Sequence, residues 1–123
     1  MTERMIAAAS LALTALLSAA PGASAHAVLD RADPRAGSTV RTAPSEVKLW
    51  FTENLEPAFS TVRVVAADGR PVDRGDGRVD ADNPALLRIT LSPLPAGTYR
   101  VIWRVVSVDT HVTRGEFSFN IAP

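Results

Sequence analysis

Hydrophobic and polar residues alternate along five short segments of the chain, and no segment repeats its apolar residues with helical spacing. The five segments are 46–53, 61–67, 85–91, 98–106 and 115–121. Alternation with a period of two is typical of strands that bury one face. The residues expected on the buried faces include Val47, Leu49, Phe51, Leu87, Ile89, Leu91, Tyr99, Val101, Trp103, Val105, Phe117, Phe119 and Ile121. Short strands separated by turn residues predict an all-β chain folded as an antiparallel β-sandwich.

Turn residues separate these segments. Asp68-Gly69 is a turn dipeptide, and 93–97 reads Pro-Leu-Pro-Ala-Gly. The segment 68–84 is rich in Gly, Asp and Arg, so we expect a long loop or an irregular sheet edge. Trp103 and Phe117 could form a ligand platform, but their place in alternating strands favours packing. We expect the face that carries Arg100 and Arg104 to be solvated.

The first 25 residues have the pattern of a secretory signal peptide. A charged start with Arg4 is followed by an apolar run and then by the small residues Ala23-Ser24-Ala25. The run from Met5 to Ala20 is shorter than the roughly 20 residues that a membrane-spanning helix needs. We therefore predict cleavage after Ala25, a single domain over 26–123, and export to the periplasm or cell envelope without direct membrane insertion.

Composition narrows the classes of partner. The formal net charge is zero, which gives no support for binding nucleic acid or an anionic membrane. The chain contains no cysteine, so disulfides cannot stabilise the domain. Both methionines, Met1 and Met5, belong to the predicted signal peptide.

The two histidines, His26 and His111, lie in positions that suit a metal site. Cleavage after Ala25 would give His26 a free α-amine, and this amine and its imidazole Nδ1 can close a six-membered chelate ring. Asp109 precedes His111 by two residues, and residues so spaced in an extended segment point to one face. Together these groups would supply three nitrogens and one oxygen.

This donor set favours one Cu(II) ion. Nitrogen and oxygen ligands in tetragonal geometry are typical of Cu(II), which also binds most tightly among the divalent ions of its series. Zn(II) is the natural competitor, because it accepts imidazole and carboxylate ligands in a tetrahedron. Cu(I) prefers sulfur ligands, which residues 26–123 lack, so we expect no Cu(I) site.

Three segments resemble the CopC-type periplasmic copper-resistance proteins, a family of small Ig-like (cupredoxin-like) sandwiches that bind Cu(II). The first is HAVLDRADPRAG, which starts at the processed histidine, and the second is APSEVKLWFTE, which ends in Phe-x-Glu. The third, LPAGTYRVIWRVVSVDTHVTRGEFSF, is the most specific, with Ser-x-Asp-x-His near its centre. The resemblance implies that His26, Asp109 and His111 are the copper ligands. It also implies that Glu53 lies near the site or at a solvent-facing strand end.

The chain departs from the family pattern at three points. Thr110 stands where the family usually has glycine between the Asp and the His. A β-branched residue resists positive φ, so this loop must stay extended or carry strain. Ala32 replaces a frequent serine and removes one local hydrogen bond. Without methionines in the exported part, the Cu(I) site of some members is missing, which indicates a Cu(II)-only protein.

We favour a binding protein over an enzyme: a copper chaperone or sequestering carrier for copper resistance and homeostasis. The resemblance implies a separate CopD-like inner-membrane copper transport protein as the partner that receives the ion. One alternative is a copper oxygenase, because an N-terminal histidine and a second histidine also form a histidine brace. Another is an Ig-like adhesive module that binds no metal.

Overall fold

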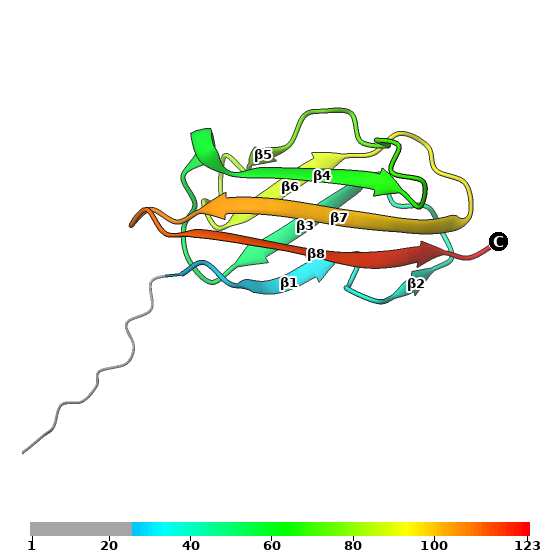
Figure 1. Cartoon of the computed structure of the whole chain (residues 1–123), viewed down its shortest axis with the longest axis horizontal. Helices are drawn as coiled ribbons and strands as arrows, with labels where there is room; N and C mark the ends of the chain where they lie inside the picture. The colour runs from blue at the N-terminus through cyan, green and yellow to red at the C-terminus, as the bar shows by residue number, and fades with distance from the viewer. Residues whose placement is uncertain (1–25) are drawn as a thin grey trace, which may run out of the picture.

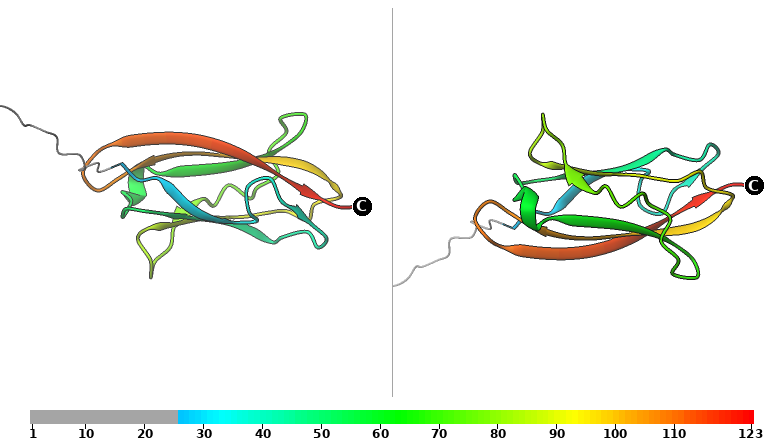
Figure 2. Two further views of the ribbon diagram at one scale, coloured as in Figure 1. Left: turned by 90° about the horizontal axis from the view of Figure 1, so that it is seen from below. Right: turned by 90° about the horizontal axis from the view of Figure 1, so that it is seen from above.

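The computed structural model describes residues 26–123, and the predicted signal peptide lies outside the described residues. The described chain forms two four-stranded sheets that pack face to face (Figures 1 and 2). The first sheet has the order β1-β3-β6-β5 and the second has the order β2-β8-β7-β4. The elements are β1 (Leu29–Asp33), β2 (Thr39–Val40), β3 (Glu46–Phe51), the 3-10 helix η1 (Pro57–Phe59), β4 (Thr61–Ala66), β5 (Arg78–Val79), β6 (Leu86–Thr90), β7 (Gly97–Val106) and β8 (Val112–Ile121). The predicted β-sandwich is confirmed.

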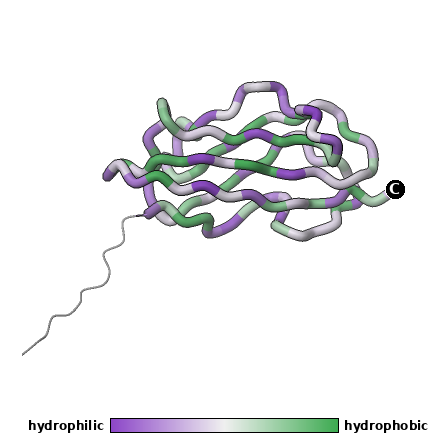
Figure 3. Tube along the Cα trace, in the orientation of Figure 1, coloured by the Kyte–Doolittle hydropathy of each residue, from purple (hydrophilic) through white to green (hydrophobic). Residues whose placement is uncertain are grey.

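The core lies between the two sheets, where alternate residues of each strand meet. Figure 3 shows this alternation of hydrophobic and hydrophilic positions along the strands. The predicted apolar positions on β3, β6 and β7 are buried, apart from the partly buried Trp103. On β8, Phe119 and Ile121 are buried and Phe117 is partly buried. Removing this apolar area from water is the main favourable contribution to the fold. The domain has no disulfide to add to it.

Trp103 packs inside the sandwich, as expected. Its ring makes an edge contact with Phe51 of the opposite sheet, with centroids 6.2 Å apart, and lies 5.9 Å from the ring of Phe117. The indole also covers Gly115 on the neighbouring strand. A Cβ atom at position 115 would lie 2.4 Å from the ring, so this close approach requires glycine.

The short edge strands were not predicted from the alternation. β1, β2 and β5 carry too few alternating apolar residues to give a signal, and β2 pairs with β8 in parallel, so the sandwich is not wholly antiparallel. The expected turn at Asp68-Gly69 is confirmed, with Gly69 at φ 87°. The segment 68–84 is the expected irregular edge, and it contains β5.

The long β7–β8 hairpin places its turn, residues 107–111, at one end of the sandwich. The described chain begins at this same end, and the C-terminus lies at the opposite end (Figure 1). The bend after β3 and the helix η1 are also at the end that holds the turn. The two histidines, far apart in the sequence, therefore belong to one end of the molecule.

Candidate metal centre

The β7–β8 turn is held by its own backbone. The amide of Ser107 donates to the carbonyl of His111 at 2.9 Å, and the amide of Thr110 donates to the carbonyl of Ser107 at 2.8 Å. Closing the turn in this way puts Thr110 at φ 76°. The left-handed region costs a residue other than glycine roughly 1–2 kcal/mol. We expected this loop either to stay extended or to carry strain at Thr110, and the structure shows the strained conformation.

The segment that follows β3 clamps the turn from one side. The amide of Val108 donates to the carbonyl of Asn54 at 3.1 Å, and Leu55 forms an isolated β-bridge with Ser107. The amide of Glu56 donates to the carbonyl of Val106 at 2.8 Å. These contacts fix the backbone from which Asp109 extends.

The first described residues are fixed against the same end. The amide of Val28 donates to Thr52 Oγ1 at 3.0 Å, and the amide of Thr52 donates to the carbonyl of Val28 at 2.9 Å. Ala27 is buried, and its carbonyl accepts a hydrogen bond from Thr113 Oγ1 at 2.8 Å. His26 is therefore attached to a segment anchored on β8, next to the turn that holds His111.

The structure brings the three predicted residues together: His111 contacts His26 on one side and Asp109 on the other. The rings of His26 and His111 meet edge to face, with centroids 4.6 Å apart. His111 Nδ1 lies 3.2 Å from Asp109 Oδ1. The side chains of His111 and Asp109 are 51% and 41% exposed, so an ion can reach them from solvent. Within residues 26–123, no three His, Cys, Asp or Glu side chains are already arranged to hold a metal ion.

Asp109 approaches His111 for a different reason from the one expected. We expected both residues on one face of an extended segment, whereas residues 107–111 form the β7–β8 turn. The hydroxyl of Ser107 donates to Asp109 Oδ1 and is the main cause that lowers the pKa of Asp109, with His111 contributing further. Both contacts stabilise the charged carboxylate, which is the form that binds a metal ion.

Ser107 was not among the predicted site residues. Its side chain contacts both members of the Asp-x-His pair, although the residue is only 1% exposed. The signal available in the sequence was the Ser-x-Asp-x-His motif, in which the serine is the first member. The hydroxyl at this position can reach both Asp109 and the amide of His111 only because the chain turns.

Glu53 lies in the bend that follows β3, and its side chain is exposed. Its neighbours Thr52 and Asn54 bond to Val28 and Val108, so its backbone belongs to the end that holds the turn. Among the described residues, no hydrogen bond or ion pair is formed by the carboxylate of Glu53. This placement fits both expected settings, since Glu53 faces solvent and its backbone lies at the end that holds the turn.

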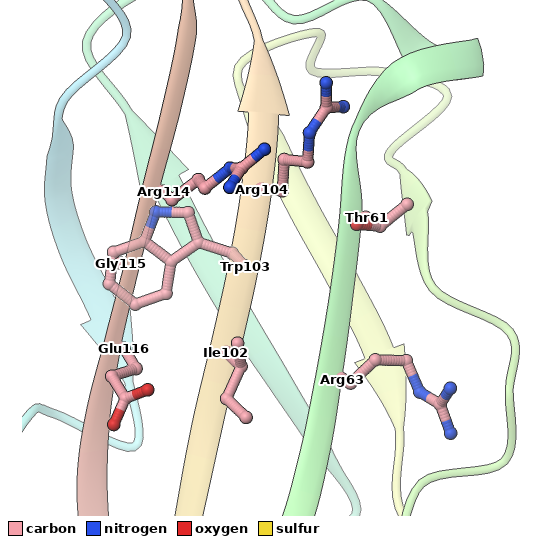
Figure 4. Close-up of a pocket in the computed structure, with 8 residues that line it drawn as sticks. All are labelled: Thr61, Arg63, Ile102, Trp103, Arg104, Arg114, Gly115 and Glu116. Atoms are coloured by element: carbon pink, nitrogen blue, oxygen red, sulfur yellow. The ribbon is translucent and has the colours of Figure 1, made fainter.

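A groove of about 500 Å³ lies elsewhere, on the outer face of the second sheet. Figure 4 shows its lining, in which Arg104 and Arg114 extend from neighbouring strands. None of the three predicted ligands lines this groove. The described residues include no helix with the length and apolar character needed to cross a membrane.

Known proteins match this chain over most of its described length. Copper resistance protein C of Escherichia coli is 37% identical over an alignment of 106 positions, which covers 80% of this chain and 83% of that protein. The copper transport protein CutJ of Bacillus subtilis is 32% identical over 98 residues, which are 79% of this chain. The chain spans only 18% of the length of CutJ.

Solved structures share the same sandwich. CopC from Methylosinus trichosporium OB3b matches with a TM-score of 0.71 and 34% identity, over 80% of this chain and 95% of that one. PcoC, a methionine-rich copper resistance protein from Escherichia coli, matches with a TM-score of 0.70 and 38% identity. The match covers 79% of this chain and 99% of that one. The family model described as the CopC domain matches residues 29–122. This chain therefore belongs to the CopC family.

Proposed function

We propose that this protein is an exported Cu(II)-binding protein of copper resistance and homeostasis, with His26, Asp109 and His111 as its metal ligands. The observation that carries the proposal is the ring contact between His26 and His111, with centroids 4.6 Å apart. These are the only two histidines in the sequence, and they come from segments far apart along the chain. Packing at one end of the sandwich holds both segments in place.

Processing completes the ligand set in this proposal. Cleavage after Ala25 converts the backbone nitrogen of His26 from a peptide nitrogen to a free amine, which chelates the ion together with Nδ1 of the same residue. One residue that supplies two donors lowers the entropy lost when the site assembles. The amine, two imidazoles and the carboxylate of Asp109 then bind one Cu(II) ion.

The donor types support Cu(II) over Cu(I). Cu(I) prefers cysteine and methionine sulfur, and residues 26–123 contain neither. The Escherichia coli relative PcoC is described as methionine rich, so this chain differs from that relative in the chemistry that would hold Cu(I). We propose a protein that carries Cu(II) alone.

The protein acts as a carrier or sequestering protein in the periplasm or cell envelope, and a CopD-like membrane protein receives its copper. The exposure of Asp109 and His111 supports this role, because an acceptor must reach the ligands to take the ion. A CopC-like segment that forms 18% of the copper transport protein CutJ also supports it. In that relative the segment is joined to a much longer chain.

We favour binding over catalysis because of Asp109. A histidine-brace oxygenase must keep a copper position open for oxygen, whereas Asp109 lies 3.2 Å from His111 Nδ1 and would supply a further donor. A binding protein gains affinity from such a donor. The proposed activity is therefore transfer and storage of the ion.

An electron paramagnetic resonance spectrum of the processed protein, residues 26–123, with one equivalent of Cu(II) tests this function. We expect a tetragonal Cu(II) signal with coupling to several nitrogens, and loss of that signal in His111→Ala. Val108→Ala, an exposed position in the same turn, serves as the matched control and should leave the signal unchanged. Free aqueous Cu(II) in the processed wild-type sample would contradict the proposal.

A further inference from the structure

We infer that the buried hydroxyl of Ser107 is a positioning group for the copper site, acting through Asp109. This inference rests on the proposed function, since it concerns the same ligands. Ser107 does not contact the ion in this account. Its role is to hold the carboxylate in one orientation and to join it to the backbone that carries His111.

The hydrogen bonds of Ser107 converge on the two predicted ligands in the turn. Its Oγ donates to Asp109 Oδ1 and accepts from the amide of His111 at 3.3 Å. Its backbone amide donates to the carbonyl of His111 at 2.9 Å. One residue therefore fixes the side chain of Asp109 and both backbone polar groups of His111.

Burial makes this anchor rigid. Ser107 is 1% exposed, and its backbone is joined to Leu55 by the bridge between the turn and the segment after β3. Asp109, in contrast, is on the surface, where an unrestrained carboxylate would sample several rotamers. Fixing a ligand before the ion arrives removes an entropy cost from binding, and partners of this kind typically contribute about 10- to 100-fold in metal affinity.

The arrangement also decides which oxygen of Asp109 can bind copper. Oδ1 accepts the hydroxyl of Ser107 and lies 3.2 Å from His111 Nδ1. Oδ2 makes neither of these two contacts, so it is the oxygen available to the ion. The serine thus selects the donor atom as well as the rotamer.

The test compares the processed wild-type protein with Ser107→Ala, Asp109→Asn and the double variant in competition titrations with Cu(II). We expect Ser107→Ala to weaken Cu(II) binding by about 10- to 100-fold and to change the Cu(II) hyperfine coupling. Because the serine acts through the aspartate, Ser107→Ala should add little in the Asp109→Asn background. Equal affinity and an unchanged spectrum in Ser107→Ala, or full additivity in the double variant, would overturn the inference.

Ser60→Ala is the matched control. Ser60 is also buried, and its Oγ bonds to the backbone of Val106, next to Ser107, without contact to the predicted ligands. The Ser60→Ala variant should have a lower free energy of unfolding than the wild type and an unchanged affinity for Cu(II). Equal losses of affinity in Ser60→Ala and Ser107→Ala would show a merely structural role and would overturn the inference.

A measurement without metal separates this inference from the proposed function. Three-bond couplings in the metal-free protein should show one χ1 rotamer for Asp109 in the wild type and averaging in Ser107→Ala. Averaging already present in the wild type would overturn the inference. A single rotamer in a wild-type protein that binds no Cu(II) would support the positioning by Ser107 and contradict the copper function instead.

Discussion

The candidate site depends on a turn whose conformation at Thr110 suits glycine better than threonine. Thr110 is the only residue other than glycine with positive φ between residues 26 and 123. It adopts this conformation because Ser107 must bond to both Thr110 and His111 to close the turn. The geometry that brings Asp109 to His111 thus includes local strain at the residue between them.

Replacing Thr110 with glycine should therefore stabilise the fold. The strain relieved, roughly 1–2 kcal/mol, exceeds the entropy that glycine loses on folding, roughly 0.5–1 kcal/mol. We expect Thr110→Gly to raise the free energy of unfolding by about 0.5–1 kcal/mol in urea denaturation. Thr42→Gly, at an exposed loop position without positive φ, should be destabilising. If Thr110→Gly loses as much stability as the control, the backbone of Thr110 is not strained in the wild type.

Among the elements, the irregular edge 68–84 is joined to β4 by backbone pairing and by the buried carboxylate of Asp73. Asp73 accepts from Arg63 Nε at 2.9 Å and from the amides of Val64 and Gly75, each at 2.8 Å. Burial alone would raise the pKa of Asp73, but Arg63 and the two amides outweigh it and hold the pKa below the ordinary value. The carboxylate is thus stabilised in its charged form.

This pairing predicts how stability varies with pH. A carboxyl group whose pKa is lowered by folding stabilises the protein above its ordinary pKa of about 3.9, and the contribution is lost as pH falls through the native value. Asp73→Asn should cost about 1–3 kcal/mol at pH 7 and less at pH 3, measured by urea denaturation. Asp82→Asn, at an exposed position of the same edge, is the control and should behave as the wild type. An equal cost of Asp73→Asn at both pH values would show that its charge does not contribute.

The elements also show what the sequence could and could not predict. β3, β4, β6, β7 and β8 were predicted because residues such as Val47, Leu49 and Phe51 alternate with polar ones. β1 reads Leu-Asp-Arg-Ala-Asp and has no such pattern. It is held by pairing with β3, where the guanidinium of Arg31 stacks 3.7 Å from the ring centroid of Trp50. A contact between strands of this kind leaves no periodic signal.

The candidate site was predictable to a similar extent. The Asp-x-His spacing correctly brought Asp109 and His111 together, although a turn rather than an extended segment does so. The approach of His26 depends on hydrogen bonds of the segments around Thr52 and Thr113, which only the folded chain reveals. Ser107 was missed because a serine before an acidic residue is common, and its burial became evident only from the structure.

The sandwich as a whole places the start of the described chain beside the β7–β8 turn. The hairpin extends the turn to one end, and the hydrogen bonds of Ala27 and Val28 hold His26 there. We propose that the fold presents the N-terminus of the processed protein to His111 as a chelating ligand. The amine is the donor that processing adds to the two imidazoles and the carboxylate of Asp109.

A competition titration with Cu(II) tests this arrangement, using the processed protein and the same protein with the α-amine of His26 acetylated. Acetylation removes the amine donor without adding another one, and it leaves the packing of residues 27–123 intact. We expect the acetylated protein to bind Cu(II) about 100-fold more weakly or worse, which corresponds to about 2.7 kcal/mol. Binding by the processed protein should also weaken as pH falls, because the amine and imidazoles must lose protons to bind. Equal affinity of the two proteins would show that the amine of His26 is not a copper ligand.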